Sequence, residues 1–371
     1  MSNVFVTYSN VVTPLGTGSR FVFERMLSKI PGIEQDEKGF FISTFSKADQ
    51  RNLFGNNFSE EFPASSNMLL FLLDELQKNN PVDLADPQTL LIICSTKGDI
   101  DSFPVITELP LQSLAFSIRL KYKLGNEPVI ISNACISGLN GIIHASRLLV
   151  DDYYSRIIVL GVDSVSDFVK KGFESLSALS MDRCAPFDAS RKGLNLGEGA
   201  AIMVLEKTPA DKFSVKVSGG ALSNDANHIT GPSRDGSGLY KAIKKVIDDT
   251  NVSLKEDNAF ISPHGTGTVY NDEMESLAFT TAALTDVPMI GMKGYFGHTL
   301  GPSGMLEAIM GLEVLHTGQL PVTLGYREHG VTGAVKFIKE NEAIGKLESP
   351  GYFLKTGSGF GGCNAAVLFE K

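Results

Sequence analysis

The chain has 371 residues and a formal net charge of −9, and 43% of its residues are hydrophobic and 20% charged. This length allows two core-forming units or one large duplicated unit, and the composition is that of an ordinary globular enzyme. A negative net charge repels phosphate backbones and so disfavours nucleic-acid binding, and no run of eighteen apolar residues predicts a membrane span.

Strands and helices are predicted to alternate along the chain, and several of the strands are apolar on both faces, as in a layered α/β fold. Expected strands cover residues 4–6, 90–94, 129–132, 157–160, 201–205, 215–217, 259–262, 289–291, 352–355 and 366–369. Helical patterns lie between them, for example at 138–150, 274–284 and 305–315.

A polar turn at residues 207–211 follows a complete strand and is the best candidate for a junction. It divides the chain into an N-terminal half, residues 1–206, and a C-terminal half, residues 212–371. Each half opens with a strand and later has a strand that runs into a reactive-looking loop, so the pattern predicts a duplicated α/β unit.

Cysteine usage and the N-terminus point to one compartment. The four cysteines are scattered, at Cys94, Cys135, Cys184 and Cys363, without the spacing of a zinc site or a disulfide framework. Residues 1–6 lack the basic stretch of a secretory signal. We therefore expect a cytoplasmic protein with free thiols.

Cys135 lies in the first of four segments that carry chemistry, residues 132–138, between an expected strand and an expected helix. Unpaired N–H groups at the start of a helix favour a thiolate, so this position predicts a lowered pKa and a nucleophile. Gly138 and Gly141 allow close packing of that helix. The alternative is a buried structural cysteine, which is the common case for an arbitrary cysteine.

The second segment, residues 263–268, places His264 at the end of a buried strand, followed by a loop of glycines and threonines with Asp272 and Glu275 beyond it. Such a loop lets a ligand approach the backbone closely and offers hydroxyl groups. The alternative is a simple turn with a hydrogen-bonded histidine.

The third and fourth segments are rich in glycine. Residues 293–304 place His298 just before a helix whose first turn suits Pro302. Residues 359–362 lie between two C-terminal strands without the lysine and helix of a phosphate loop, so they indicate a tight turn that presents a backbone N–H.

In this order and spacing, the four segments resemble the elongating β-ketoacyl synthases of fatty-acid and polyketide assembly. Residues 13–16 resemble the family's opening turn, and residues 186–200 resemble its mid-chain signature. The resemblance implies the thiolase-like fold, an α/β fold with a duplicated five-layered αβαβα architecture, usually in a dimer.

The resemblance also implies roles for single residues. Cys135 matches the acyl-accepting nucleophile, and the remaining catalytic positions are His264, His298, Lys293 and Glu307. Phe360 matches the gating aromatic residue, whose N–H joins that of Cys135 in an oxyanion hole. The substrate-binding positions are Thr266, Thr268 and Arg191.

The implied reaction is a decarboxylating Claisen condensation of an acyl group on Cys135 with malonyl-acyl carrier protein. The expected partners are an acyl carrier protein, malonyl and acyl thioesters, and a second synthase-like chain in a homodimer or heterodimer. We expect no metal and no cofactor, because the phosphopantetheine belongs to the carrier protein. The alternative is a chain-length-factor-like partner subunit of a heterodimeric synthase, a class that usually lacks the nucleophile.

The sequence departs from the family pattern in a few places. Residues 262–263 are Ser-Pro instead of Glu-Ala, residues 302–303 are Pro-Ser instead of Ala-Ala, and Cys363 replaces threonine. The stretch between Cys94 and Cys135 is shorter than in typical elongating synthases, where it helps to form the dimer contact and the acyl pocket. A specialised pocket or a paired subunit is therefore expected, and the alternative is a harmless loop deletion, which surface loops tolerate easily.

Overall fold

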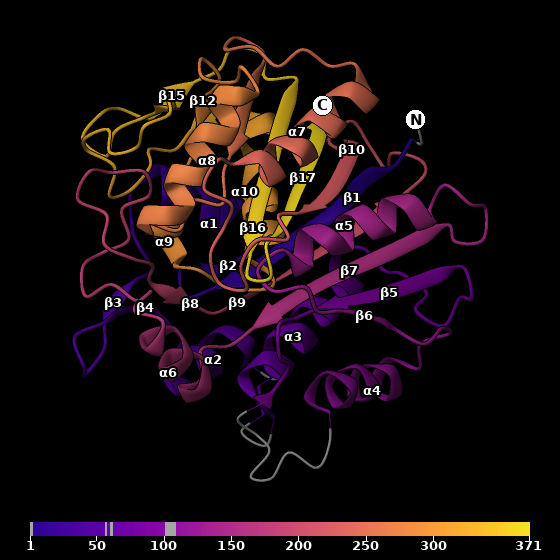
Figure 1. Cartoon of the computed structure of the whole chain (residues 1–371). Helices are drawn as coiled ribbons and strands as arrows, with labels where there is room; N and C mark the ends of the chain where they lie inside the picture. The colour runs from indigo at the N-terminus through magenta and orange to yellow at the C-terminus, as the bar shows by residue number, and fades with distance from the viewer. Residues whose placement is uncertain (1–2, 56–57, 60–61, 101–108) are drawn as a thin grey trace.

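The computed structural model describes residues 3–55, 58–59, 62–100 and 109–371, and these residues form one large sheet with helices on both sides (Figure 1). The strand order in that sheet is β14-β12-β11-β16-β17-β10-β1-β9-β7-β5-β6, and the short β2 pairs with β1. The sheet divides between β1 and β10, which pair over only two positions, Phe5 with Lys216 and Val6 with Val215.

The N-terminal part of the sheet contains five long-range paired strands: β1 (Phe5–Thr13), β5 (Thr89–Cys94), β6 (Val129–Ile131), β7 (Arg156–Asp163) and β9 (Gly199–Glu206). From the centre outward their order is β1, β9, β7, β5, β6. The first two pairings are antiparallel, and the β7–β5 and β5–β6 pairings are parallel.

The C-terminal part repeats this plan with β10 (Val215–Asn224), β11 (Ala259–Ser262), β12 (Pro288–Met289), β16 (Tyr352–Gly359) and β17 (Cys363–Glu370). Its order from the centre is β10, β17, β16, β11, β12, again with two antiparallel and then two parallel pairings. The second copy is extended by β14 (Lys336–Phe337). The predicted duplication is therefore confirmed as a repeat of topology.

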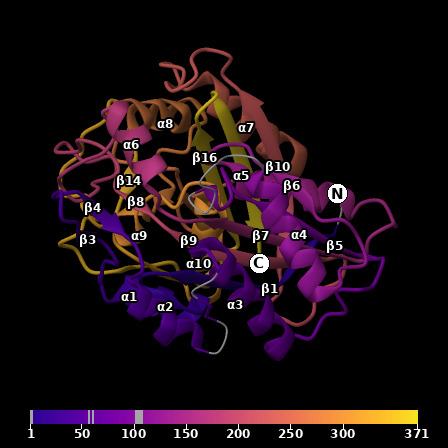
Figure 2. The same cartoon turned by 90° about the horizontal axis from the view of Figure 1, so that it is seen from below.

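The helices complete five layers. Two helices, α5 (Ser137–Leu148) and α10 (Ser303–Thr317), pack against each other and against strands of both half-sheets, so they form the middle layer. Figures 1 and 2 show α3 (Ala64–Asn79) and α4 (Pro110–Tyr122) outside the N-terminal half-sheet, and α7 (Ser237–Thr250) and α8 (Val269–Thr281) outside the C-terminal one.

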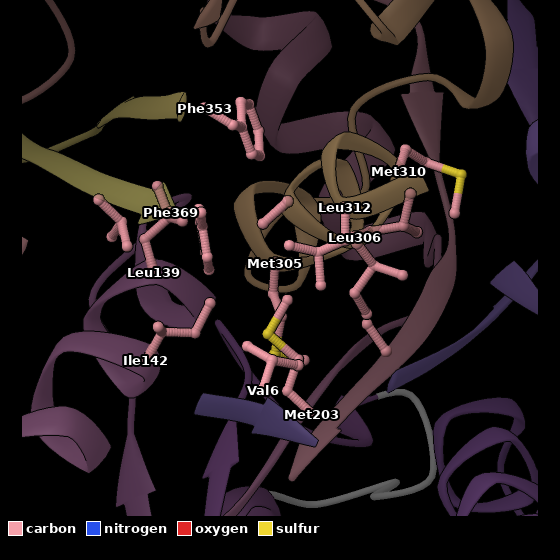
Figure 3. Packing of buried hydrophobic residues seen from close by; sticks show 14 of the residues in the cluster. Val6, Leu139, Ile142, Met203, Met305, Leu306, Met310, Leu312, Phe353 and Phe369 are labelled. Atoms are coloured by element: carbon pink, nitrogen blue, oxygen red, sulfur yellow. The ribbon is translucent and has the colours of Figure 1, made fainter. Parts of the chain in front are cut away.

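Apolar side chains from both half-sheets meet the middle helices in the main core. Figure 3 shows Leu139 and Ile142 of α5, Met305 and Leu306 of α10, and Phe353 of β16 in this cluster. Each large apolar side chain that leaves water contributes roughly 1.5–3 kcal/mol, so this interface holds the two copies together. Each half also has a cluster of its own, which lies between its half-sheet and its outer helices.

Glycine allows the middle helices to approach each other. A Cβ atom on Gly138 would lie 2.9 Å from the Cβ of Met305 and 3.1 Å from the Gly301 oxygen, and a Cβ on Gly304 would lie 2.5 Å from Leu139. The Gly138 N–H donates to that same Gly301 oxygen at 2.9 Å. The predicted close packing of the Cys135 helix is confirmed for Gly138.

The other elements are short. They are α1 (Ser19–Leu27), α2 (Lys47–Phe54), α6 (Asp167–Ser175), α9 (Lys293–Phe296), β2 (Gly16–Thr17), β3 (Glu34–Gln35), β4 (Phe41–Ser43), β8 (Leu196–Gly197), β13 (Gln319–Leu320) and β15 (Gly345–Lys346). Across the described part of the chain, none of the helices is both long enough and apolar enough to span a bilayer. All of the predicted strands and helices occur, and α8 begins at Val269, before the predicted position 274.

Candidate active site

Cys135 lies between β6 and α5, at the point where the chain turns from the strand into the middle layer. The turn is tight: Ala134 has a φ of 44°, which is unusual for a residue with a Cβ. Ser137 closes it, because its hydroxyl accepts from the Asn133 N–H at 2.8 Å and donates to the Ala134 carbonyl at 2.7 Å. The thiol is therefore held at the start of α5, with 7% of the residue exposed.

Burial decides the protonation state of this thiol. It raises the pKa of Cys135 to about 11, although the Lys293 ammonium and the N–H groups of Phe360 and Cys135 itself act in the opposite direction. The expectation of a lowered pKa is wrong, because the loss of solvation outweighs the effect of the helix start. The resting group is a thiol.

Two backbone N–H groups approach the Cys135 sulfur, its own and that of Phe360. Phe360 follows Gly359 in the turn between β16 and β17, where Gly359 pairs with Cys363. A Cβ on Gly359 would lie 3.1 Å from the Cys135 nitrogen, a tight contact, so glycine helps this turn to come close to Cys135. The two N–H groups therefore converge on the sulfur.

His264 follows β11 and is fixed through its backbone. Glu275 on α8 accepts from the N–H groups of His264 and Gly265, both at 2.7 Å. The His264 Nδ1 lies 3.4 Å from the Lys293 Nζ. An ammonium can only donate, so Nδ1 is the acceptor in the neutral ring and Nε2 carries the hydrogen.

His298 lies between α9 and α10, and its ring is perpendicular to that of His264, with 5.0 Å between the ring centroids. Its Nδ1 accepts from the Leu300 N–H at 3.3 Å, which again leaves the hydrogen on Nε2. Burial, and then Lys293, hold the pKa of each histidine well below the ordinary value of an imidazole. Both rings are neutral donors at neutral pH.

Beneath the two rings lies a fully buried group of charges. The Lys293 Nζ is 2.7 Å from the Glu307 Oε1 and also donates to the His264 carbonyl oxygen. The second oxygen of Glu307 lies 2.6 Å from the Nζ of Lys355, a lysine on β16. That contact is an ion pair rather than a well-directed hydrogen bond, since Oε2 has no aligned donor.

One ligand atom each from Cys135, His264 and His298 lie within 4.8 Å of one another. Three such atoms could hold a metal ion on distance alone. The ammonium groups of Lys293 and Lys355 oppose a cation here, because both lower the pKa of the two histidines through their positive charge. We assign no metal to the site.

A cavity of about 520 Å³ opens over this centre. Thr266 and Thr268 line it, with their hydroxyl oxygens 2.9 Å apart, as do Cys135 and both histidines. At the mouth, Phe173 of α6 stacks on Phe360 with 5.5 Å between ring centroids. The two threonine hydroxyls and the Cys135 sulfur therefore share one cavity.

Comparison with known proteins identifies the family. The family model "Beta-ketoacyl synthase, N-terminal domain" matches residues 92–210, and "Beta-ketoacyl synthase, C-terminal domain" matches residues 215–327. The chain belongs to the β-ketoacyl synthase family. Its fold is thiolase-like, as predicted.

Individual relatives are distant. The chain is 30% identical to 3-oxoacyl-[acyl-carrier-protein] synthase 2 of Vibrio cholerae over 70% of its own length and 66% of that protein, so it aligns with slightly less than two thirds of that relative. A β-ketoacyl synthase from Burkholderia phymatum superposes with a TM-score of 0.86 at 22% identity, covering all of both chains. A ketosynthase in complex with its chain length factor from Xenorhabdus doucetiae gives a TM-score of 0.82 at 20% identity, covering all of this chain and 98% of that one.

Of the nine site residues predicted from the sequence, Arg191 is the one that lies away from the cavity and from the charges beneath it. The other eight gather around the cavity or the charges beneath it, whereas Arg191 is outside the residues that line the cavity. Its guanidinium donates to the carbonyl of Asp188 at 2.9 Å and to that of Gly330. These contacts show that Arg191 braces a loop.

Sequence reasoning missed two side chains of this synthase site, Lys355 and Phe173. Lys355 interrupts the apolar run of β16, where a buried charge is unusual, and that signal was available. Phe173 meets Phe360 only through the tertiary fold, and no local pattern marks it.

Proposed function

We propose that this synthase catalyses a decarboxylating Claisen condensation between an acyl group on Cys135 and malonyl-acyl carrier protein. The observation that carries the proposal is the meeting of a thiol and two neutral imidazoles within 4.8 Å, in a cavity where two N–H groups approach the sulfur. The family, and the printed name of the Vibrio cholerae relative, support the carrier protein as the substrate's bearer.

In the first step the Cys135 sulfur attacks the carbonyl carbon of an acyl thioester. The N–H groups of Cys135 and Phe360 donate to the oxyanion, and each such donor is commonly worth about 3 kcal/mol. The carbon–sulfur bond to the carrier's thiol then breaks. The proton of Cys135 passes to the leaving thiolate, and the acyl group stays on the enzyme.

In the second step malonyl-carrier protein occupies the emptied cavity. The bond between its carboxylate and its α-carbon breaks, carbon dioxide leaves, and the electron pair forms an enolate of the thioester. The Nε2–H groups of His264 and His298 donate to the enolate oxygen, because their Nδ1 atoms already accept from Lys293 and Leu300. Neutral donors suit this step, since a protonated imidazole would stabilise the starting carboxylate instead.

In the third step the enolate carbon attacks the acyl carbonyl on Cys135. A carbon–carbon bond forms, the oxyanion again lies in the hole formed by the two N–H groups, and collapse expels the Cys135 thiolate. The thiolate takes up a proton from solvent water, and the product leaves as β-ketoacyl-carrier protein. None of the three steps uses a cofactor held by this chain, because the phosphopantetheine arrives on the carrier.

The direct test is intact-mass measurement after incubation with a panel of acyl carrier protein thioesters. The wild-type chain is expected to gain one acyl mass, which maps to Cys135. A Cys135→Ala variant is expected to gain none, and Cys94→Ala serves as the matched control because Cys94 is also buried. Acylation that maps to Cys94, Cys184 or Cys363 would refute the assignment.

We place the partner chain on the outer edge of the N-terminal half-sheet. Within the described residues, β6 pairs only with β5, and the neighbouring α4 exposes Phe116 and Leu120. An unpaired strand edge beside apolar side chains favours pairing with a second chain. The chain-length-factor complex among the structural relatives supports a synthase-like partner, and a homodimer is the other form.

The shortened stretch between Cys94 and Cys135 contains this edge, and its residues 101–108 lie outside the described residues. The proposal of a specialised pocket or a paired subunit rests on it. We expect the isolated chain to extend ordinary saturated acyl carriers poorly, or to need a second chain for full activity. A stable homodimer that extends them as fast as a housekeeping elongating synthase would contradict this expectation.

A further inference from the structure

Lys355 occupies a position that an apolar side chain would normally fill. On β16, Phe353 and Lys355 share the face toward the middle layer, where Phe353 belongs to the main core. Lys355 is fully buried. Burying an ammonium costs several kcal/mol unless partners replace its water, so its contacts explain why the fold accepts it.

Its partners are concentrated at the end of β11. The Lys355 Nζ lies 3.1 Å from the Ser262 carbonyl oxygen, 3.2 Å from the Ser262 hydroxyl and 2.9 Å from the Pro263 carbonyl oxygen. The fourth contact is the ion pair with Glu307 on α10. A lysine has three hydrogens to donate, so these acceptors satisfy it completely.

Two lysines thus hold three successive carbonyl groups around a catalytic histidine. Lys355 donates to the carbonyl oxygens of Ser262 and Pro263, and Lys293 donates to the carbonyl oxygen of His264. On the other side, Glu275 accepts the N–H groups of His264 and Gly265. The backbone of His264 is therefore fixed from both sides, with Lys355 responsible for the residues that lead into it.

We propose that Lys355 is a positioning residue for the decarboxylation step. Lys355 shares Glu307 with Lys293, and it fixes the backbone from which the His264 side chain projects. The inference rests on the proposed function of the site. It adds a second buried cation to the lysine and glutamate that the sequence identified.

The positive charge of Lys355 also affects the pKa of the two histidines. Glu307 carries one negative charge between two ammonium groups, and Glu275 on α8, another carboxyl that acts on Lys355, has a pKa raised to about 7 by burial. The positive potential that results lowers the pKa of both His264 and His298; burial is the largest cause, then Lys293, with Lys355 adding to both. Burial also lowers the pKa of Lys355 itself to about 8, while Glu307 acts against that.

The test is the Lys355→Met variant, because it leaves the pair of Lys293 and Glu307 balanced and fills the space with an apolar chain. The variant leaves the buried carbonyl oxygens of Ser262 and Pro263 without this donor, so its folded state is checked by circular dichroism and urea unfolding before the rates are compared. We expect acyl-enzyme formation to stay within about twofold of wild type, and the release of carbon dioxide from malonyl-carrier protein to fall about tenfold, since small misplacements of a catalytic group cost this much or more.

The pH profile separates positioning from mere packing. Without the Lys355 charge the pKa of both imidazoles rises, so they protonate at higher pH and the acidic fall in decarboxylation moves upward. Lys355→Arg keeps the charge and is expected to keep the acidic limb near its wild-type place. Ser262→Ala removes one acceptor and keeps the charge, so its limb is also expected to stay.

The outcomes are distinct. If wild type releases no carbon dioxide from malonyl-carrier protein, the proposed function fails. If wild type does so, and folded Lys355→Met matches it in rate and in acidic limb, the role of Lys355 is refuted. A lower rate with a shifted limb, partly restored in Lys355→Arg, supports it.

Discussion

The two halves of the molecule share one topology and anchor their strand ends with opposite charges. In the N-terminal half, Asp163 at the end of β7 accepts from Ser95, Thr96 and Lys97, which follow β5. In the C-terminal half the corresponding strand, β16, carries Lys355, which donates to the carbonyls of Ser262 and Pro263 at the end of β11.

The difference shows what the duplicated fold supplies and what the residues add. The fold brings equivalent strand ends to one place, and the sign of the buried charge decides which chemistry each end supports. The Glu307 carboxylate acts to raise the pKa of the histidines, but the two ammonium groups of Lys293 and Lys355 outnumber it and lower that pKa. Asp163 also accepts from the Gly301 N–H at 2.8 Å, so the first half holds the loop that carries His298.

The largest effect is expected where the C-terminal half loses a donor. His298→Ala removes one hydrogen bond to the enolate, so release of carbon dioxide should fall about 100-fold. Acylation of Cys135 should persist, because the N–H groups that serve it are backbone groups. Intact mass and carbon dioxide release measure the two half-reactions. His144→Ala, at an exposed histidine of α5, is the matched control. Normal decarboxylation in His298→Ala would remove His298 from the mechanism.

The second prediction concerns stability in the N-terminal half. Asp163→Asn leaves the ammonium of Lys97 buried without its counter-charge, which typically costs about 3 kcal/mol. Urea unfolding should show a lower midpoint, and the double variant Lys97→Met with Asp163→Asn should recover much of the loss. Lys355→Met should also lower the midpoint, because it leaves the buried oxygens of Ser262 and Pro263 without this donor. Equal midpoints for Asp163→Asn and wild type would break the comparison between the halves.

Local patterns predicted much of this architecture. Apolar runs gave the strands, and the motifs around Cys135, His264, His298 and Lys293 identified residues that the structure brings together. The ionisation of Cys135 could not be predicted, because it depends on burial that the fold creates. Lys355 was missed because its partner, Ser262, lies 93 residues away in the chain and only the pairing of β11 with β16 brings them into contact.

A third prediction follows from the raised pKa of Cys135. The pKa of this thiol is about 11. At any pH below that value, the thiolate fraction grows about tenfold for each unit by which the pH rises. Alkylation of the resting enzyme by iodoacetamide, followed by intact mass, should therefore accelerate from pH 7 to about pH 9. Peptide mapping assigns the adduct, with Cys135→Ala as the control. A rate at Cys135 that is constant over this range would show that a neighbouring base already holds its proton.

The smallest effect is expected at the rim of the cavity. Lys192 lines the cavity, is exposed and pairs with Asp182 at 2.7 Å, so it can meet an acidic carrier, as can the exposed Lys47. Lys192→Glu should raise the KM for carrier-bound substrate about threefold and leave kcat unchanged. Lys255→Glu, at another exposed lysine, is the control. Arg191 is a poor target because it braces a loop. An unchanged KM would place the carrier elsewhere.

The most direct measurement is a single turnover of enzyme already acylated at Cys135. After malonyl-carrier protein is added, the loss of the acyl mass, the carbon dioxide released and the β-ketoacyl product are followed together. The proposed function predicts that the three change at one rate and in a ratio of one to one to one. Loss of the acyl group as a free acid, or carbon dioxide release while the acyl mass stays on Cys135, would contradict it.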